Sequence, residues 1–294
     1  MDYPRNYRWA VPAAMAAVAC TVAGIRGDQS SFRSRVDTVA IYATVSERGG
    51  QLVTNLSRED FTVLDNGKPV EITGFSNDEK PISAVVLLDV SGSMIARLRW
   101  MQDATASFVE ALKPEDRISI GSFSEKVTIA SGLTSDKLAL VRSLKSIRPG
   151  DGSSVWRAID AGMDSIRNET GRRVVVVLSD GINTEHEGVD DGDLKRRGTA
   201  EGFMVYAVGV NDKGLHPQLR DVAEETGGGH VELSVAADLK GALERVTEEL
   251  RHQYLLGFTP SVLDGAIHTL SVHARNRALI VRTAKTYLAG GGTK

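Results

Sequence analysis

The 294-residue sequence contains a single cysteine, Cys20, so it has no second thiol with which to form an intrachain disulfide. The sequence also lacks an excess of charge of one sign, because 35 Lys and Arg residues nearly balance 38 Asp and Glu residues and leave a formal net charge of −3. Nucleic-acid binding depends on a basic surface that neutralises phosphates. We therefore expect neither a disulfide-stapled scaffold nor a nucleic-acid partner.

The sequence also lacks the common catalytic motifs. It contains no Gly-x-Ser-x-Gly nucleophile elbow, no His-Glu-x-x-His zinc helix and no Walker A phosphate loop. Its six histidines are scattered, without the spacing of metal ligands. We expect the protein not to be an enzyme, and a metal-assisted hydrolase is the weaker alternative.

No uncharged stretch reaches the roughly 20 apolar residues that a spanning helix needs. The longest, Trp9 to Ile25, follows a start with two arginines and is rich in small residues. This pattern predicts a secretory signal peptide over residues 1–24. We expect export to the periplasm, the cell surface or the medium, with membrane attachment only through an N-terminal anchor. Cys20 in Ala17-Val-Ala-Cys20 resembles a lipoprotein acylation site, although a small apolar residue within the signal peptide is the favoured interpretation.

What the chain does contain is an apolar run that ends in oxygen-bearing side chains. Pro81 to Leu88 leads directly into Asp89, Ser91 and Ser93, with Gly92 between the serines. Such a run predicts a strand buried on both faces of a parallel sheet, and ligands bind beyond the carboxyl ends of these strands. A carboxylate and two hydroxyls suit a hard cation such as Mg2+ better than zinc. Helix N-capping by the same residues is the simpler alternative.

A second apolar run makes capping the weaker explanation. Val174 to Leu178 leads through Ser179 into Asp180 and Gly181. Two buried parallel strands would bring Asp89 and Asp180 to the same edge of one sheet.

The two motifs, Asp89-Val-Ser-Gly-Ser93 and Leu178-Ser-Asp-Gly181, resemble the metal-ion-dependent adhesion site (MIDAS) of von Willebrand factor A (vWA) domains. The likeness extends from about Val36 to Tyr287 and is closest to a bacterial family of secreted "VWFA-related" proteins. Two flanking signatures carry that closer match, Arg58 to Gly67 before the domain and Arg251 to Pro260 after it.

The resemblance implies a set of metal ligands and a mode of binding. The ligands are Asp89, Ser91, Ser93, Ser153 and Asp180, where Ser153 stands at the family's threonine and Asp151 replaces a neighbouring glycine. The expected cation is Mg2+, with Mn2+ or Ca2+ as alternatives. An Asp or Glu carboxylate of a protein partner would complete its coordination. The resemblance therefore implies a cation-dependent, adhesion-type protein-binding module, and a structural or assembly scaffold is the alternative.

The pattern along the chain predicts its organisation. From about residue 79 to 251 strands alternate with helices, which predicts an α/β fold with a doubly wound, Rossmann-like parallel sheet. Residues 36–78 and 252–288 read as short strands, with an Asn66-Gly67 hairpin turn in the first segment. Neither segment has enough strands to be stable alone, so we expect them to form one small antiparallel sandwich around the inserted domain. Residues 25–35 are a predicted linker and residues 289–294 a predicted disordered tail.

Overall fold

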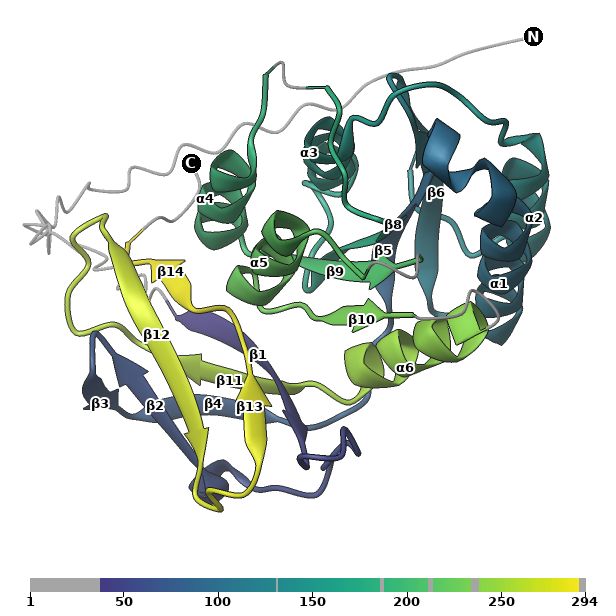
Figure 1. Ribbon diagram of the computed structural model, residues 1–294. Coiled ribbons are helices and arrows are strands. Elements are labelled where there is room, and N and C mark those ends of the chain that lie inside the picture. The colour runs from purple at the N-terminus through teal and green to yellow at the C-terminus, as the bar shows by residue number, and fades with distance from the viewer. Residues whose placement is uncertain (1–37, 131, 186–187, 211–213, 234–237, 291–294) are drawn as a thin grey trace, which may run out of the picture. The chain divides into compact units, whose positions relative to one another are not determined.

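The computed structural model describes residues 38–130, 132–185, 188–210, 214–233 and 238–290. Its central sheet has six strands in the order β10-β9-β8-β5-β6-β7 (Figure 1). All neighbouring strands are parallel except β6 and β7. The strands are β5 (Ser83–Asp89), β6 (Arg117–Phe123), β7 (Val127–Ile129), β8 (Arg173–Ser179), β9 (Phe203–Gly209) and β10 (His230–Glu232). The predicted doubly wound α/β fold is confirmed.

Helices cover both faces of this sheet. Strands β5, β8 and β9 are buried along almost their whole length because each is a continuous apolar run, and successive side chains feed two separate cores. One core packs under α1, α2 and α6, and the other under α3, α4 and α5 (Figure 1). The helices are α1 (Leu98–Ala111), α2 (Lys137–Ser146), α3 (Val155–Ser165), α4 (Asp191–Glu201), α5 (Pro217–Glu225) and α6 (Leu239–Arg251).

Two further sheets are antiparallel and contain four strands each, in the orders β13-β1-β11-β4 and β14-β12-β2-β3. Each sheet combines strands from before and after the central domain: β1 pairs with β11, and β2 pairs with β12. Both sheets contribute apolar side chains to one core that includes Ile41, Phe61, Tyr254 and Leu270. The strands are β1 (Val39–Ser46), β2 (Phe61–Asp65), β3 (Lys68–Val70), β4 (Ile72–Ser76), β11 (Tyr254–Phe258), β12 (Ile267–Ala274), β13 (Ile280–Arg282) and β14 (Thr286–Leu288).

The predicted signal peptide, the linker and Cys20 lie outside the described residues. Ala289, which the prediction places at the start of the disordered tail, is fully buried, and its N–H donates to the Ala266 carbonyl at 2.9 Å. Residues 291–294 lie outside the described part. Within the described residues, no helix is long and apolar enough to cross a bilayer.

Two buried arginines join the points where the chain enters and leaves the central domain. Arg172 donates to the carbonyl oxygens of Lys80 and Pro81 on the entering segment and to Gln253 Oε1 on the leaving segment. Arg251, at the end of α6, forms a 2.6 Å ion pair with Asp116, which is fully buried.

Asp116 is the centre of the second of these links. Its carboxylate also accepts N–H bonds from Ile82 at 2.9 Å and Lys113 at 2.7 Å. Burial alone would raise the pKa of Asp116, but the bonds from Arg251 and the two backbone N–H groups hold it below its ordinary value. The carboxylate is therefore charged at neutral pH and fixes the start of β5 to the end of α6.

This link predicts a large loss of stability when one partner is removed. Arg251→Met leaves the Asp116 carboxylate buried without its cation, which costs about 3–5 kcal/mol. Urea unfolding at pH 7 measures the change in the free energy of unfolding. Arg245→Met, at an exposed position of the same helix, is the matched control and should stay within about 0.5 kcal/mol of the wild type. Equal effects of the two substitutions would contradict the structural role of the ion pair.

Candidate metal centre

The five residues with MIDAS-like spacing come from three loops at one edge of the central sheet. Strand β5 lies between β6 and β8: the chain continues from β5 to β6 on one side and later crosses from β7 to β8 on the other side. A crevice for ligands forms outside the carboxyl ends of strands at such a switch point. Asp89 ends β5, Asp180 directly follows β8, and Ser153 lies in the loop before α3.

Asp89 is the most deeply buried member of this cluster, with an exposed fraction of 0%. Its Oδ1 accepts the Ser91 N–H at 2.9 Å. Its Oδ2 accepts the hydroxyls of Ser179 at 2.6 Å and Ser153 at 3.3 Å. The carboxylate is therefore held in place by neighbours from one strand, β8, and from two loops.

Ser91 and Ser93 lie on a tight turn that continues β5. A 3-10 helix, η2 (Gly92–Arg97), starts immediately after Ser91, and α1 begins at Leu98. The two hydroxyl oxygens lie 3.3 Å apart. The Ser93 hydroxyl donates to Asp180 Oδ2 at 3.0 Å, which connects the β5 turn to the β8 turn.

Backbone contacts fix the loop that carries Ser153. The N–H of Gly150 donates to the Val90 carbonyl at 2.9 Å, and the N–H of Glu125 donates to the Asp151 carbonyl at 2.8 Å. The Ser153 N–H donates to the Thr184 hydroxyl at 2.7 Å, and its side chain is buried against Asp89. All five predicted residues are thus joined by one hydrogen-bond network.

The electrostatics of the cluster are unbalanced. Burial raises the pKa of the Asp89 carboxyl, hydrogen bonds from Ser179 and Ser91 oppose that effect, and the nearby Asp180 carboxylate raises the pKa further. Among the described residues, no Lys, Arg or His side chain bonds to either carboxylate, whose partners are hydroxyls and backbone N–H groups. An uncompensated pair of buried acids is the environment that a bound cation relieves.

The donor set also limits the kind of metal. The described residues contain no group of three or more His, Cys, Asp or Glu side chains arranged to hold an ion. A metal here would rely on hydroxyl oxygens in addition to two carboxylates. Oxygen ligands of this kind suit hard cations better than the softer metals that thiolate and imidazole ligands bind. The residues present therefore fit a Mg2+-like ion.

Sequence reasoning missed two residues of this network, Ser179 and Thr184. A polar residue at the end of the apolar run Val174 to Leu178 was the available signal for Ser179. Thr184 gave no signal, because its role depends on the folded position of the Ser153 loop. Trp156, next to that loop, is 6% exposed and packs within the core under α3.

Comparison with known proteins identifies a family for part of the chain. Residues 84–183 match the family model of the von Willebrand factor type A domain. The chain contains a vWA domain. The match begins inside β5 and ends three residues after Asp180, so it includes all five residues of the cluster.

Solved structures show the same fold at low sequence identity. An aerotolerance-related membrane protein from Bacteroides fragilis, solved with multiple mutations to serines, is 20% identical over 57% of this chain and 98% of its own, with a TM-score of 0.50. A von Willebrand factor type A protein from Catenulispora acidiphila is 13% identical over 88% of this chain and 64% of its own, with a TM-score of 0.52. Proximal thread matrix protein 1 from the mussel byssus, solved with a zinc-occupied MIDAS motif, is 18% identical over 62% of this chain and 48% of its own, with a TM-score of 0.51.

The turn after Asp180 gives a prediction about how the site is held. Gly181 has a φ of +80°, and a Cβ added there would lie 2.9 Å from the Cβ of His216. Gly171 has a similar φ of +83° but open space around it. Gly171→Ala should cost about 1–2 kcal/mol from the left-handed backbone alone, and Gly181→Ala should cost more. Urea unfolding measures both, and equal losses would show that the His216 contact does not constrain the turn.

Proposed function

We propose that this vWA domain binds a divalent cation and uses it to hold a carboxylate of a partner protein. The observation that carries the proposal is the buried pair Asp89 and Asp180, which have no cationic partner among the described residues. Ser91, Ser93 and Ser153 add hydroxyl oxygens to the same cluster. A divalent ion would balance the two negative charges and replace the hydrogen bonds that now connect these oxygens.

Mg2+ is the proposed cation, with Mn2+ and Ca2+ as alternatives. Hydroxyl and carboxylate oxygens are ligands that these ions prefer, and Mg2+ commonly keeps some coordination positions for water or a ligand. With two carboxylates in the cluster, a bound ion would be formally neutralised and still accept an acidic ligand. The zinc-occupied MIDAS of the mussel protein supports a metal-binding role for this fold.

The surroundings of the cluster favour a protein as the ligand. Ile95 follows Ser93 by two residues and is 52% exposed, and Ile182 follows Asp180 by two residues and is 47% exposed. Exposed apolar side chains beside a polar centre are common in protein-binding surfaces. We therefore propose an acidic residue flanked by apolar ones as the partner's contact, on a protein exported to the periplasm, cell surface or medium.

The metal part of the proposal predicts the effect of a single charge removal. Asp89→Asn keeps the shape of the side chain but removes its charge, and should weaken Mg2+ binding by about 2–5 kcal/mol. Isothermal titration calorimetry of the full chain measures the affinity. Asp136→Asn is the control, because Asp136 caps α2 away from the cluster and Asn caps equally well. An equal Mg2+ affinity of the wild type and Asp89→Asn would contradict the proposal.

Partner binding predicts a second, separate result. The wild-type protein, immobilised, should retain a protein from the native envelope in Mg2+ and release it on addition of EDTA, whereas Asp89→Asn should retain none. After release, amidation of the partner's carboxylates should prevent it from binding again to the immobilised protein in Mg2+. Retention that persists in EDTA would favour the scaffold alternative. Mg2+-dependent turnover in phosphatase or peptidase assays would favour the hydrolase.

A further inference from the structure

A buried group of four polar side chains lies in the antiparallel sandwich and takes no part in the metal centre. His268, on β12, is 6% exposed. Its Nδ1 lies 2.8 Å from Oδ1 of Asp65, at the end of β2, and 3.2 Å from the hydroxyl of Tyr287, on β14. Its Nε2 lies 3.3 Å from Oδ1 and 3.4 Å from Oδ2 of Asp264, in the loop between β11 and β12. Each ring nitrogen of His268 therefore faces a carboxylate.

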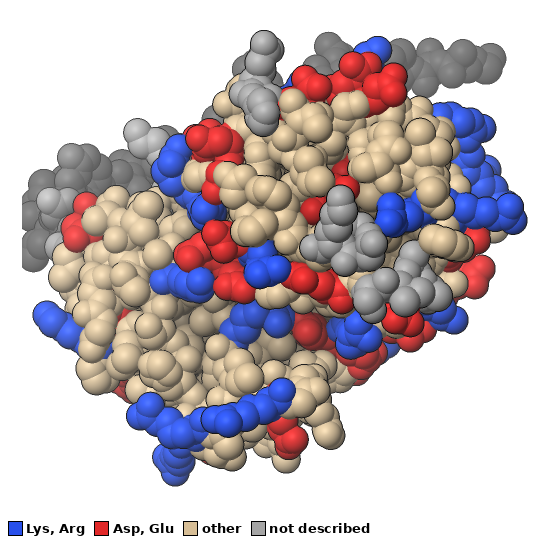
Figure 2. Space-filling model, viewed as in Figure 1, with Lys and Arg blue, Asp and Glu red and all other residues tan. Residues whose placement is uncertain are grey.

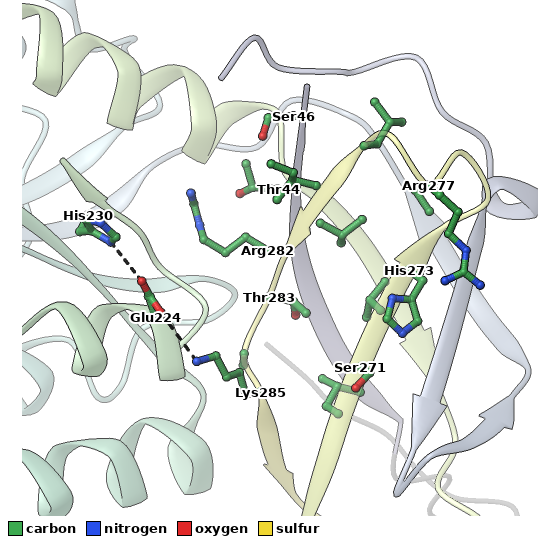
Figure 3. Close-up of a pocket in the computed structure, with 17 residues that line it drawn as sticks. Thr44, Ser46, Glu224, His230, Ser271, His273, Arg277, Arg282, Thr283 and Lys285 are labelled. Carbon is green, nitrogen blue, oxygen red and sulfur yellow. Dashed lines mark ion pairs between the residues drawn. The ribbon is translucent and has the colours of Figure 1, made fainter. Parts of the chain in front are cut away.

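The alternation of side chains along β12 explains why His268 is buried. Every second residue of this strand is buried, and His268 lies on the same face as Leu270 and Val272, which belong to the core of the sandwich. Ser271 and His273 lie on the opposite face, where both are drawn in Figure 3. His273 is exposed and forms no ion pair within the described part of the chain. Strand β12 therefore carries one histidine between two acids and one without an acidic partner.

No lysine or arginine neutralises the two acids that face His268. Among the described residues, the ion pairs of Asp65 and Asp264 are formed with His268 alone. Lys68 stands opposite Asp65 in the register of β2 and β3, but it is exposed and forms no ion pair with Asp65. Basic side chains gather instead at the other end of β12, near its turn to β13 (Figure 2). A proton on His268 is therefore the available positive charge for this pair of acids.

The arrangement favours the protonated form of the imidazole. A neutral imidazole has a single N–H and can donate to only one of the two carboxylates, whereas the imidazolium donates to both. The hydrogen bond with Asp65 is the main cause that raises the pKa of His268 above its ordinary value of 6.5, and Asp264 raises it further against the opposing effect of burial. Burial and a hydrogen bond with Asp65 raise the pKa of Tyr287, so its hydroxyl stays neutral.

Asp264 connects His268 to the loop of residues 259–266. Its Oδ1 also accepts the Ala266 N–H at 2.9 Å, and the Ala266 N–H and His268 hold the pKa of Asp264 below its ordinary value. Asp264 therefore stays charged while His268 titrates. A neutral His268 keeps its N–H on the closer, buried Asp65 and turns a lone pair toward Asp264. Because the Asp264 side chain is 45% exposed, it can then move into water.

We propose that His268 is a pH-sensitive latch, which holds the loop of residues 259–266 against β12 when it is protonated and releases the loop when it is neutral. The contribution of the latch to stability is fully present below the ordinary pKa of 6.5 and is lost as the pH rises through the higher pKa of the folded protein. The loop carries Val262 and Leu263, which are 53% and 50% exposed. The latch therefore controls how this apolar pair is presented, and it is independent of the proposed metal centre.

Nuclear magnetic resonance of the full chain in a pH series tests the proposal with two readouts. The ring Hε1 resonance of His268, assigned with His268→Gln, reports the proton. The exchange protection of the Gly265 and Ala266 amides, which donate to the Ala289 carbonyl and to Asp264, reports the loop. The His268 midpoint should lie above pH 6.5, and the protection of both amides should fall about tenfold as the pH passes it. Unchanged protection, or a midpoint below pH 6.5, would overturn the proposal.

Removal of one charge separates the latch from a purely structural contact. Asp264→Asn removes the charge that faces Nε2 and keeps an oxygen that can accept the Ala266 N–H. This variant should lower the His268 midpoint and abolish the pH dependence of the loop's protection. His273→Gln, at the exposed histidine of the same strand, is the matched control and should leave both readouts as in the wild type. Equal results for the two variants would contradict the role of Asp264.

Discussion

The burial of the Asp89 carboxylate without a cation is the constraint on which the site depends. A carboxylate at the end of a parallel strand, with no exposed surface, is unfavourable unless its charge is compensated. Here the carboxylate receives only hydrogen bonds from neutral groups, namely the N–H of Ser91 and the hydroxyls of Ser153 and Ser179. A second acid, Asp180, shares the network through Ser93. The arrangement is satisfied in hydrogen bonds but not in charge, and this difference is why a cation fits it.

The rest of the fold keeps that edge of the sheet in position. Strand β5 must end at Asp89 for the carboxylate to reach its neighbours, and its start is held by Asp116 and Arg251 through the Ile82 N–H. Arg172 contacts both the entering and the leaving chain, which allows the vWA domain to stand as an insertion between strands that pair with each other. The antiparallel strands therefore belong to the same structural unit as the central sheet.

The sequence was most informative where one local pattern determines the structure. The apolar runs before Asp89 and Asp180 predicted two buried parallel strands, and their shared sheet edge followed from topology. The Ser153 loop could be placed only through resemblance, because its position depends on contacts with Val90, Glu125 and Thr184 that no periodicity records.

Other features had no readable signal in the sequence. Helix α1 starts only at Leu98 because the turn at Ser91 continues into a 3-10 helix, and no local pattern in the sequence records this. Strand β14 has no pattern of its own, because its three residues, Thr286–Leu288, are too few to show alternation. The placement of β12 and β13 in different sheets was likewise hidden, since a short turn between two apolar segments ordinarily predicts a paired hairpin.

Anomalous diffraction from crystals of the full chain grown with Mn2+ tests the central claim most directly. The account predicts one strong anomalous peak between the side-chain oxygens of Asp89, Ser91, Ser93, Ser153 and Asp180, and its loss in Asp89→Asn. A peak elsewhere, with the Ser93 hydroxyl still bonded to Asp180 as in the present structure, would contradict it.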